Sequence, residues 1–164
     1  MQSVLLVPLP AVRAVVEPWL ERTSPSSKPS QGIPPHVTLL FPAPDDADGV
    51  RSVITGVHAF EVELRELRRF RTTLWLVPEP AERFVRLTEA LVARFPDWPP
   101  YDGAFDAIVP HLTVAQGESA TLDAAELDVA PRLPLRDRAR EAVLLAELEP
   151  GRWVTQMTFS FEES

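Results

Sequence analysis

A five-residue pattern, proline-histidine-apolar-threonine-apolar, occurs twice in the 164-residue chain, as PHVTL at 35–39 and as PHLTV at 110–114. The two copies lie 75 residues apart, because their histidines are residues 36 and 111. Successive side chains of a β-strand point to opposite faces, so each copy would present its histidine and threonine on one face and its apolar residues on the other. The repeat therefore predicts two equivalent strands that each offer an imidazole and a hydroxyl to a shared site.

Chance is a poor explanation of the repeat. The chain contains only 3 histidines, and a given histidine has threonine two places on roughly 1 time in 20. Two of three doing so by accident has a probability on the order of 1 %. The alternative is that both histidines are ordinary polar residues near strand starts. We interpret the third, His58, as a structural or exposed residue at the end of a helical pattern.

The hydrophobic periodicity places each histidine motif second in a strand-helix-strand unit that is used twice. Strands are predicted at 3–8, at both motifs, at 60–64, at 72–77, and as a closing hairpin of 142–148 and 153–161. Helices are predicted over 12–20, 45–57, 79–95 and 121–127, the last capped by Thr121. Pro18 should kink or divide the first of these helices. A pseudo-two-fold axis would run between the two motifs.

Composition and charge exclude several classes of protein. The formal charge of −8 argues against a broad nucleic-acid surface, because non-specific binding depends on neutralising phosphates. The absence of cysteine excludes a disulfide framework and thiolate zinc sites. No apolar run approaches the roughly 20 residues that span a bilayer, and residues 3–7 are interpreted as a strand rather than a signal peptide. We expect a cytoplasmic monomer that folds as one domain over residues 1–164.

The repeated residues suit phosphoryl chemistry. Two imidazoles with ordinary pKa values near 6.5 can act as base and acid in one turnover, and neighbouring threonine hydroxyls can donate hydrogen bonds to phosphoryl oxygens. The scheme needs no metal or cofactor, and neither an HExxH zinc motif nor a G-x-S-x-G nucleophile elbow occurs. We interpret Asp45, Asp46 and Asp48 as the start of a helix rather than as metal ligands.

Both motifs, and in particular HVTLLFP at 36–42, resemble those of the 2H (two-histidine) phosphoesterase superfamily, which includes bacterial 2'-5' RNA ligase and RNA 2',3'-cyclic phosphodiesterase proteins. The resemblance covers nearly the whole chain. It implies an α+β, bilobal LigT-like fold of two pseudo-symmetric antiparallel sheets with flanking helices around a central cleft. It also implies metal-independent opening of 2',3'-cyclic phosphates, with ligation as the reverse reaction. By position, His36 and His111 would be catalytic, and Thr38 and Thr113 would bind the phosphate.

The second motif departs from this family at Gln116, where many relatives carry arginine. The lost charge, together with the acidic composition, favours a small cyclic nucleotide or an RNA 3'-terminal cyclic phosphate over a large RNA. An arginine from 65–71, namely Arg65, Arg68, Arg69 or Arg71, could replace the charge, although a solvated strand edge is the commoner meaning of such a run.

Several alternatives stay open on the sequence alone. The function could be that of a nucleotide or RNA-end binding module without turnover, or the repeat could be architecture only. The loop of residues 23–34 could cover the site or be a plain connector. Trp75 could stack on a base, but core packing is the better explanation of a lone aromatic residue.

Overall fold

The computed structural model describes residues 1–104 and 107–163, and its elements are a mixture of strands and helices. The strands are β1 Ser3–Pro8, β2 His36–Leu40, β3 Phe60–Phe70, β4 Thr73–Glu79, β5 Leu112–Gln116, β6 Leu135–Ala139, β7 Glu141–Glu149 and β8 Arg152–Ser160. The α-helices are α1 Arg13–Thr23, α2 Ala47–Ile54, α3 Ala81–Arg94 and α4 Ser119–Val129. Short 3-10 helices cover Pro10–Val12, Pro29–Gln31, Pro100–Gly103 and Ala130–Arg132.

The strands form one antiparallel sheet in the order β6-β3-β4-β5-β2-β1-β7-β8. The two histidine strands, β2 and β5, are neighbours at its centre. The order is symmetric about this central pair, since β4 and β3 follow β5 on one side while β1 and β7 follow β2 on the other. The predicted α+β class with pseudo-symmetric antiparallel halves is confirmed, and hydrogen bonds between β2 and β5 join the two expected sheets into one.

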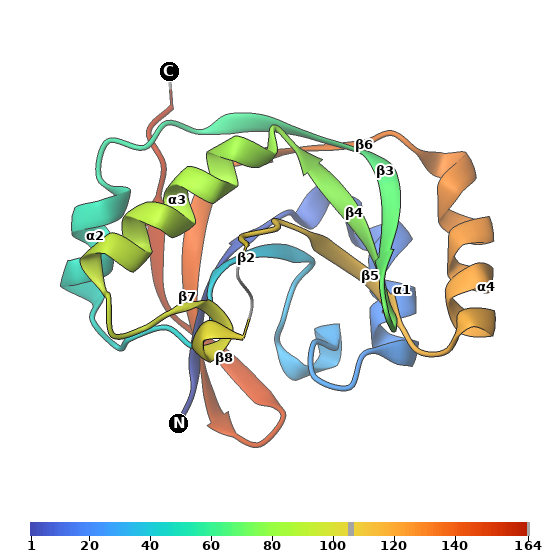
Figure 1. Cartoon of the computed structure of the whole chain (residues 1–164), viewed down its shortest axis with the longest axis horizontal. Helices are drawn as coiled ribbons and strands as arrows, with labels where there is room; N and C mark the ends of the chain where they lie inside the picture. Colours follow the sequence, from blue (N-terminus) through green and yellow to red (C-terminus); the bar gives the residue numbers. More distant parts are fainter. Residues whose placement is uncertain (105–106, 164) are drawn as a thin grey trace.

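Each half of the molecule supplies a helix that supports the other half's histidine strand. Helix α1 follows β1 in sequence but packs on β5, and α3 follows β4 but packs on β2. The buried hydroxyl of Thr88 in α3 donates a hydrogen bond of 2.7 Å to the carbonyl oxygen of Leu39 in β2. Figure 1 shows the helices as two pairs, α2 with α3 and α1 with α4, on opposite sides of the sheet's centre. The histidine strands are therefore fixed from both halves.

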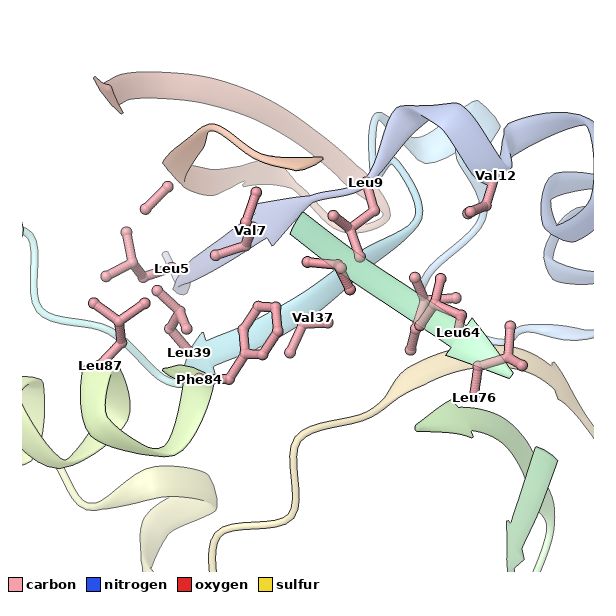
Figure 2. Packing of buried hydrophobic residues seen from close by; sticks show 14 of the residues in the cluster. Leu5, Val7, Leu9, Val12, Val37, Leu39, Leu64, Leu76, Phe84 and Leu87 are labelled. Carbon is pink, nitrogen blue, oxygen red and sulfur yellow. The ribbon is translucent and has the colours of Figure 1, made fainter. Parts of the chain in front are cut away.

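The apolar residues of both motifs belong to the main core. Val37, Leu112 and Val114 are fully buried, and Leu39 is nearly so. Figure 2 shows Val37 and Leu39 pointing into the same cluster as Phe84 of α3, together with side chains from β1. Burying a side chain of this size contributes about 1.5–3 kcal/mol. Because side chains alternate along a strand, this burial directs the histidines and threonines to the opposite face.

The structure differs in detail from two of the helix predictions. Helix α1 is not divided at Pro18, which lies inside it. Proline removes one backbone hydrogen bond, and the buried Val16 and Trp19 on either side of it keep the helix packed. Helix α4 begins at Ser119, so Thr121 is an internal residue and not the cap. Glu118 precedes the helix, and an added Cβ at the neighbouring Gly117 would lie 3.3 Å from the side chain of Thr121.

The sheet is also larger than the sequence predicts. Strand β3 continues to Phe70 rather than ending near Leu64, because its second half pairs with β4 as a hairpin. Strand β6 pairs with β3 and was not predicted. Its residues are mostly charged, as suits a sheet edge. No helix in the described part of the chain is long and apolar enough to cross a membrane.

Candidate active site

The two histidine motifs meet across the centre of the sheet, where Val37 of β2 pairs with Leu112 of β5. In an antiparallel pair, the residue before one partner lies opposite the residue after the other. Each histidine therefore lies opposite the threonine of the other strand, in the pairs His36 with Thr113 and His111 with Thr38. All four side chains are half-buried and lie on the face opposite the core. The structure thus brings together the four predicted site residues.

The same backbone contact orients both imidazoles. Nδ1 of His36 lies 2.8 Å from the carbonyl oxygen of Pro34, and Nδ1 of His111 lies 2.8 Å from that of Val109. A carbonyl oxygen can only accept a hydrogen bond, so Nδ1 carries the proton in each ring. Nε2 is then the nitrogen that can accept or deliver a proton.

Burial lowers the pKa of both histidines. The pKa of His36 falls to about 4, chiefly because burial disfavours the charged ring and in smaller part because His111 repels it, against the opposing contact with Pro34. The pKa of His111 is also lowered by burial, against the opposing contact with Val109. Electrostatic repulsion between the rings means that they share one local environment. A bound anion would favour their protonated forms.

An aromatic cluster borders His111. The ring of Phe70 stacks on Trp75, with centroids 4.8 Å apart, and meets His111 edge-on at 5.3 Å. Trp75 is 3% exposed and pairs across the strands with Thr113, so it is buried, as predicted, but on the histidine-bearing face. Its indole N–H has no hydrogen-bond partner among the described residues. Buried donors are seldom left unpaired. Phe70, at 42% exposure, presents the accessible part of this surface.

Tyr101 is a site residue that the sequence reasoning missed. It lies in the 3-10 helix before β5, and its hydroxyl is hydrogen-bonded to the side chain of Thr38. Its backbone N–H donates to the carbonyl oxygen of Phe41, which follows the first motif. Residues 97–103 have the composition of a turn, with two prolines and a glycine. Nothing in the local pattern, however, indicates which strand the turn contacts.

The arginines of β3 separate onto the two faces of the sheet. Arg68 pairs across the strands with Trp75 and so lies on the histidine-bearing face, where it contacts Glu66 at 2.7 Å. Arg69 lies on the opposite face, paired with carboxylates of α4. Arg65 contacts Glu79 at 3.0 Å. Of the predicted candidates, Arg68 is placed best to supply positive charge.

Gln116 serves as an anchor for the loop after α1. Its side-chain oxygen accepts a hydrogen bond of 2.9 Å from the buried Ser24, and its backbone N–H donates to the Thr23 hydroxyl at 3.1 Å. The same loop is fixed again at Gly32, where φ is +93° and an added Cβ would lie 2.2 Å from the carbonyl oxygen of Trp153. The loop of residues 23–34 is therefore hydrogen-bonded to β5 at one end and lies against β8 at the other.

A second, smaller apolar cluster lies on the side of Thr38 away from His111. Leu6 of β1 pairs across the strands with Thr38. It packs within a cluster of buried residues, Val4, Leu6, Ile33, Val143 and Leu145, bordered by Phe41 and Trp153. The site is thus bordered by aromatic rings and Arg68 on the side of β4 and β3. On the side of β1 and β7 it is bordered by apolar side chains.

Other features of the structure lie apart from this site. Two open hollows of about 600 Å³ and 560 Å³ flank β3 near Arg65 and Glu63, and no histidine lines either. Asp46 caps α2 by accepting from the Gly49 N–H at 2.9 Å, as predicted for that acidic run. The side chain of His58 is 57% exposed, with Nε2 3.8 Å from a carboxylate oxygen of Glu162.

A symmetric antiparallel sheet with a histidine and a threonine from each half at its centre defines the class of two-histidine proteins. The family model for the 2'-5' RNA ligase superfamily matches residues 8–150. The chain belongs to that superfamily.

Relatives and solved structures agree with this assignment. The chain is 31% identical over 143 residues to a "putative phosphoesterase" of Bacillus licheniformis, covering 77% of this chain and 80% of the relative. A Bacillus cereus protein of the same description is 28% identical over 144 residues, with 77% and 78% covered. The fold matches a protein of Thermus thermophilus with a TM-score of 0.67 at 22% identity, covering 98% of each chain. It matches apo LigT of Escherichia coli with a TM-score of 0.63 at 17% identity, covering 98% and 96%. The family model and the Bacillus licheniformis relative support a phosphoesterase, and the solved structures show a LigT-like fold.

Proposed function

We propose that this protein is a metal-independent phosphodiesterase that opens 2',3'-cyclic phosphates of small nucleotides or RNA ends, with His36 and His111 as its catalytic pair. One observation carries the proposal. The pairing of β2 with β5 sets each imidazole opposite the other strand's threonine on one accessible face of the sheet. A phosphodiester bound there would lie between two proton-transfer groups and two hydroxyl donors.

In the proposed reaction, one imidazole Nε2 takes a proton from water as the water oxygen bonds to phosphorus. The bond from phosphorus to the sugar O3' breaks, and the other imidazole delivers its Nε2 proton to that oxygen, which leaves a 2'-phosphate. Thr38 and Thr113 donate to the non-bridging oxygens, where charge collects in the transition state. Ligation would be the reverse reaction with a sugar hydroxyl in place of water.

The two histidines differ in a way that assigns their roles. His36 has the more strongly lowered pKa, at about 4, and is neutral near pH 7, as a general base must be. We assign His111 as the general acid, because its neighbours include the aromatic surface where the nucleoside that carries the departing O3' would lie. General acid and base groups contribute typically 10²- to 10⁴-fold each.

The surroundings favour a small nucleotide as ligand. The exposed ring of Phe70 can stack on a base, an interaction worth about 1–3 kcal/mol. Arg68 lies on the same face as Phe70, and the net charge of −8 opposes the approach of a long RNA. Solved structures of E. coli LigT include complexes with 3'-AMP, NADP⁺ and ATP. These complexes support small nucleotides as the ligand class for this chain.

The test is turnover of 2',3'-cyclic AMP in the presence of EDTA, by the wild-type protein and by His36→Ala, His111→Ala and His58→Ala. We expect turnover that survives EDTA and falls by about 10³-fold in the first two variants. His58→Ala is the matched control, since its ring is exposed and lies outside the site. Binding of the nucleotide without turnover would instead indicate a binding module, and neither binding nor turnover would mean that the repeat is architectural.

A further inference from the structure

The two threonines of the site have different surroundings. The hydroxyl of Tyr101 is hydrogen-bonded to Thr38, whereas no side-chain hydrogen bond to Thr113 occurs among residues 1–104 and 107–163. The symmetry of the sheet therefore does not extend to the groups around the phosphate site. The difference arises because the loop before β5 crosses over to the first histidine strand.

The backbone around Tyr101 is held in an unusual conformation. Tyr101 and Asp102 both have positive φ angles, of 52° and 56°. A non-glycine residue in this region is strained, and such residues persist where surrounding contacts fix them, often at functional sites. Here the contacts are with Phe41, through the Tyr101 backbone N–H and through ring packing with centroids 6.2 Å apart. The loop conformation holds the phenol at Thr38.

We propose that Tyr101 is a positioning residue that donates its phenol proton to Thr38 Oγ1, so that the single hydroxyl proton of Thr38 is directed at a phosphoryl oxygen of the substrate. The inference rests on the proposed function, to which it adds a residue. Burial raises the pKa of Tyr101, so the phenol keeps its proton and remains a donor at the pH of catalysis. A hydroxyl that accepts one hydrogen bond has its own proton left for the ligand and is a stronger donor.

The consequence is a functional asymmetry between the halves. Thr38 lies opposite His111 in the register set by β2 and β5. The oriented donor therefore lies beside His111, while Thr113 lies beside His36 without such support. Loss of the Tyr101 hydroxyl should weaken the hydrogen bond that Thr38 donates to the phosphate and leave the one from Thr113 unchanged.

The kinetic test combines Tyr101→Phe with Thr38→Val and, as the matched control, with Thr113→Val. Phenylalanine keeps the ring that packs on Phe41, so melting temperatures should stay close to wild type. We expect Tyr101→Phe to lower kcat on 2',3'-cyclic AMP by about 10-fold with little change in KM, as for an interaction made in the transition state. This loss should disappear in the Thr38→Val background and persist in full in the Thr113→Val background. Equal losses in both backgrounds, or no loss in the single variant, would overturn the proposal.

A spectroscopic test does not depend on turnover or on folding of a Tyr101 variant. Tyr101 is the only tyrosine in the chain, so the ultraviolet absorbance of phenolate reports on it alone. When this phenol loses its proton, the phenolate oxygen can only accept, so the Thr38 hydroxyl then donates to it, and this stabilisation of the charged form lowers the pKa of Tyr101. Thr38→Val should therefore move the titration to higher pH, and Thr113→Val should leave it in place. Identical titrations in both variants would contradict the contact itself. If the titration moves in Thr38→Val but not in Thr113→Val, the contact is established. If the wild-type protein also shows no turnover, the proposed function is refuted while the contact stands.

Discussion

Val37 of β2 pairs with Leu112 of β5, and this one cross-strand pair joins the two halves of the sheet and sets the register of the site. Both side chains are fully buried on the core face, directly behind the histidines and threonines. Packing on one face therefore determines the geometry on the other. A shift of either strand by one residue would turn the histidine and threonine of that strand toward the core.

Truncation of a side chain in this pair should destabilise the folded protein. We expect Leu112→Ala to lower the free energy of unfolding by about 2–5 kcal/mol, because it leaves a cavity at the junction of the halves. Urea denaturation followed by circular dichroism measures this change. Leu127→Ala is the control, since that side chain is 78% exposed and its loss should cost at most about 0.5 kcal/mol. Equal effects of the two substitutions would contradict the placement of Leu112 in the core.

The rate of turnover should be greatest in mildly acidic solution. The active form of the free enzyme needs a neutral His36 and a protonated His111. His36 becomes neutral as the pH rises through about 4, and His111 loses its proton below the ordinary value of 6.5 because its pKa is lowered. The profile of kcat/KM against pH should therefore be bell-shaped with its maximum between these two values, which belong to the coupled pair. A flat profile from pH 5 to 8, or a maximum above pH 7, would argue against this pair of groups.

The roles of the two histidines can be separated by the leaving group. A p-nitrophenyl ester of a nucleotide releases a stable anion and needs no general acid. We expect His111→Ala to lose about 10³-fold on 2',3'-cyclic AMP but less than about 10-fold on the p-nitrophenyl ester. His36→Ala should lose activity on both substrates, because water must still be activated. The opposite pattern in steady-state kinetics would reverse the assignment.

Two neighbouring arginines of β3 test whether positive charge on the histidine-bearing face of the sheet contributes to turnover. Arg68 lies on the histidine-bearing face, and Arg69 lies on the other, bound to Asp123 and Glu126 of α4. We expect Arg68→Ala to lower kcat/KM by about 5-fold at low ionic strength and less in 0.5 M salt, since exposed charges are screened. Arg69→Ala should change kcat/KM less than about 2-fold. Equal effects would mean that Arg68 does not act on the phosphate.

Much of the site was predictable because it follows from local patterns. The repeated motif has the period of a strand, and its apolar residues can only be satisfied in a core, so the common face of His36 and Thr38 followed directly. The second copy of the motif, around His111, predicted the pseudo-two-fold symmetry of the fold. Helix α3 was predicted with nearly its observed bounds because its apolar residues keep helical spacing between Pro80 and Pro96.

What the sequence did not reveal depends on the path of the chain in space. Tyr101 reaches Thr38 only because two non-glycine residues adopt positive φ angles, which no periodicity indicates. Trp75 is buried, as expected of a lone aromatic residue, but the face on which it is buried follows from its pairing with Thr113. Strand β6 has no apolar alternation, because it is a charged edge that pairs on one side only.

The central claim is that both imidazoles contact one phosphate, and an NMR titration of the three histidine rings with 2'-AMP tests it directly. We expect the ligand to shift the resonances of His36 and His111 together, at one stoichiometry, and to raise both pKa values, because the phosphate favours the protonated rings. The resonance of His58 should not move. A response of only one of the two rings, or of His58 to the same extent, would contradict the account.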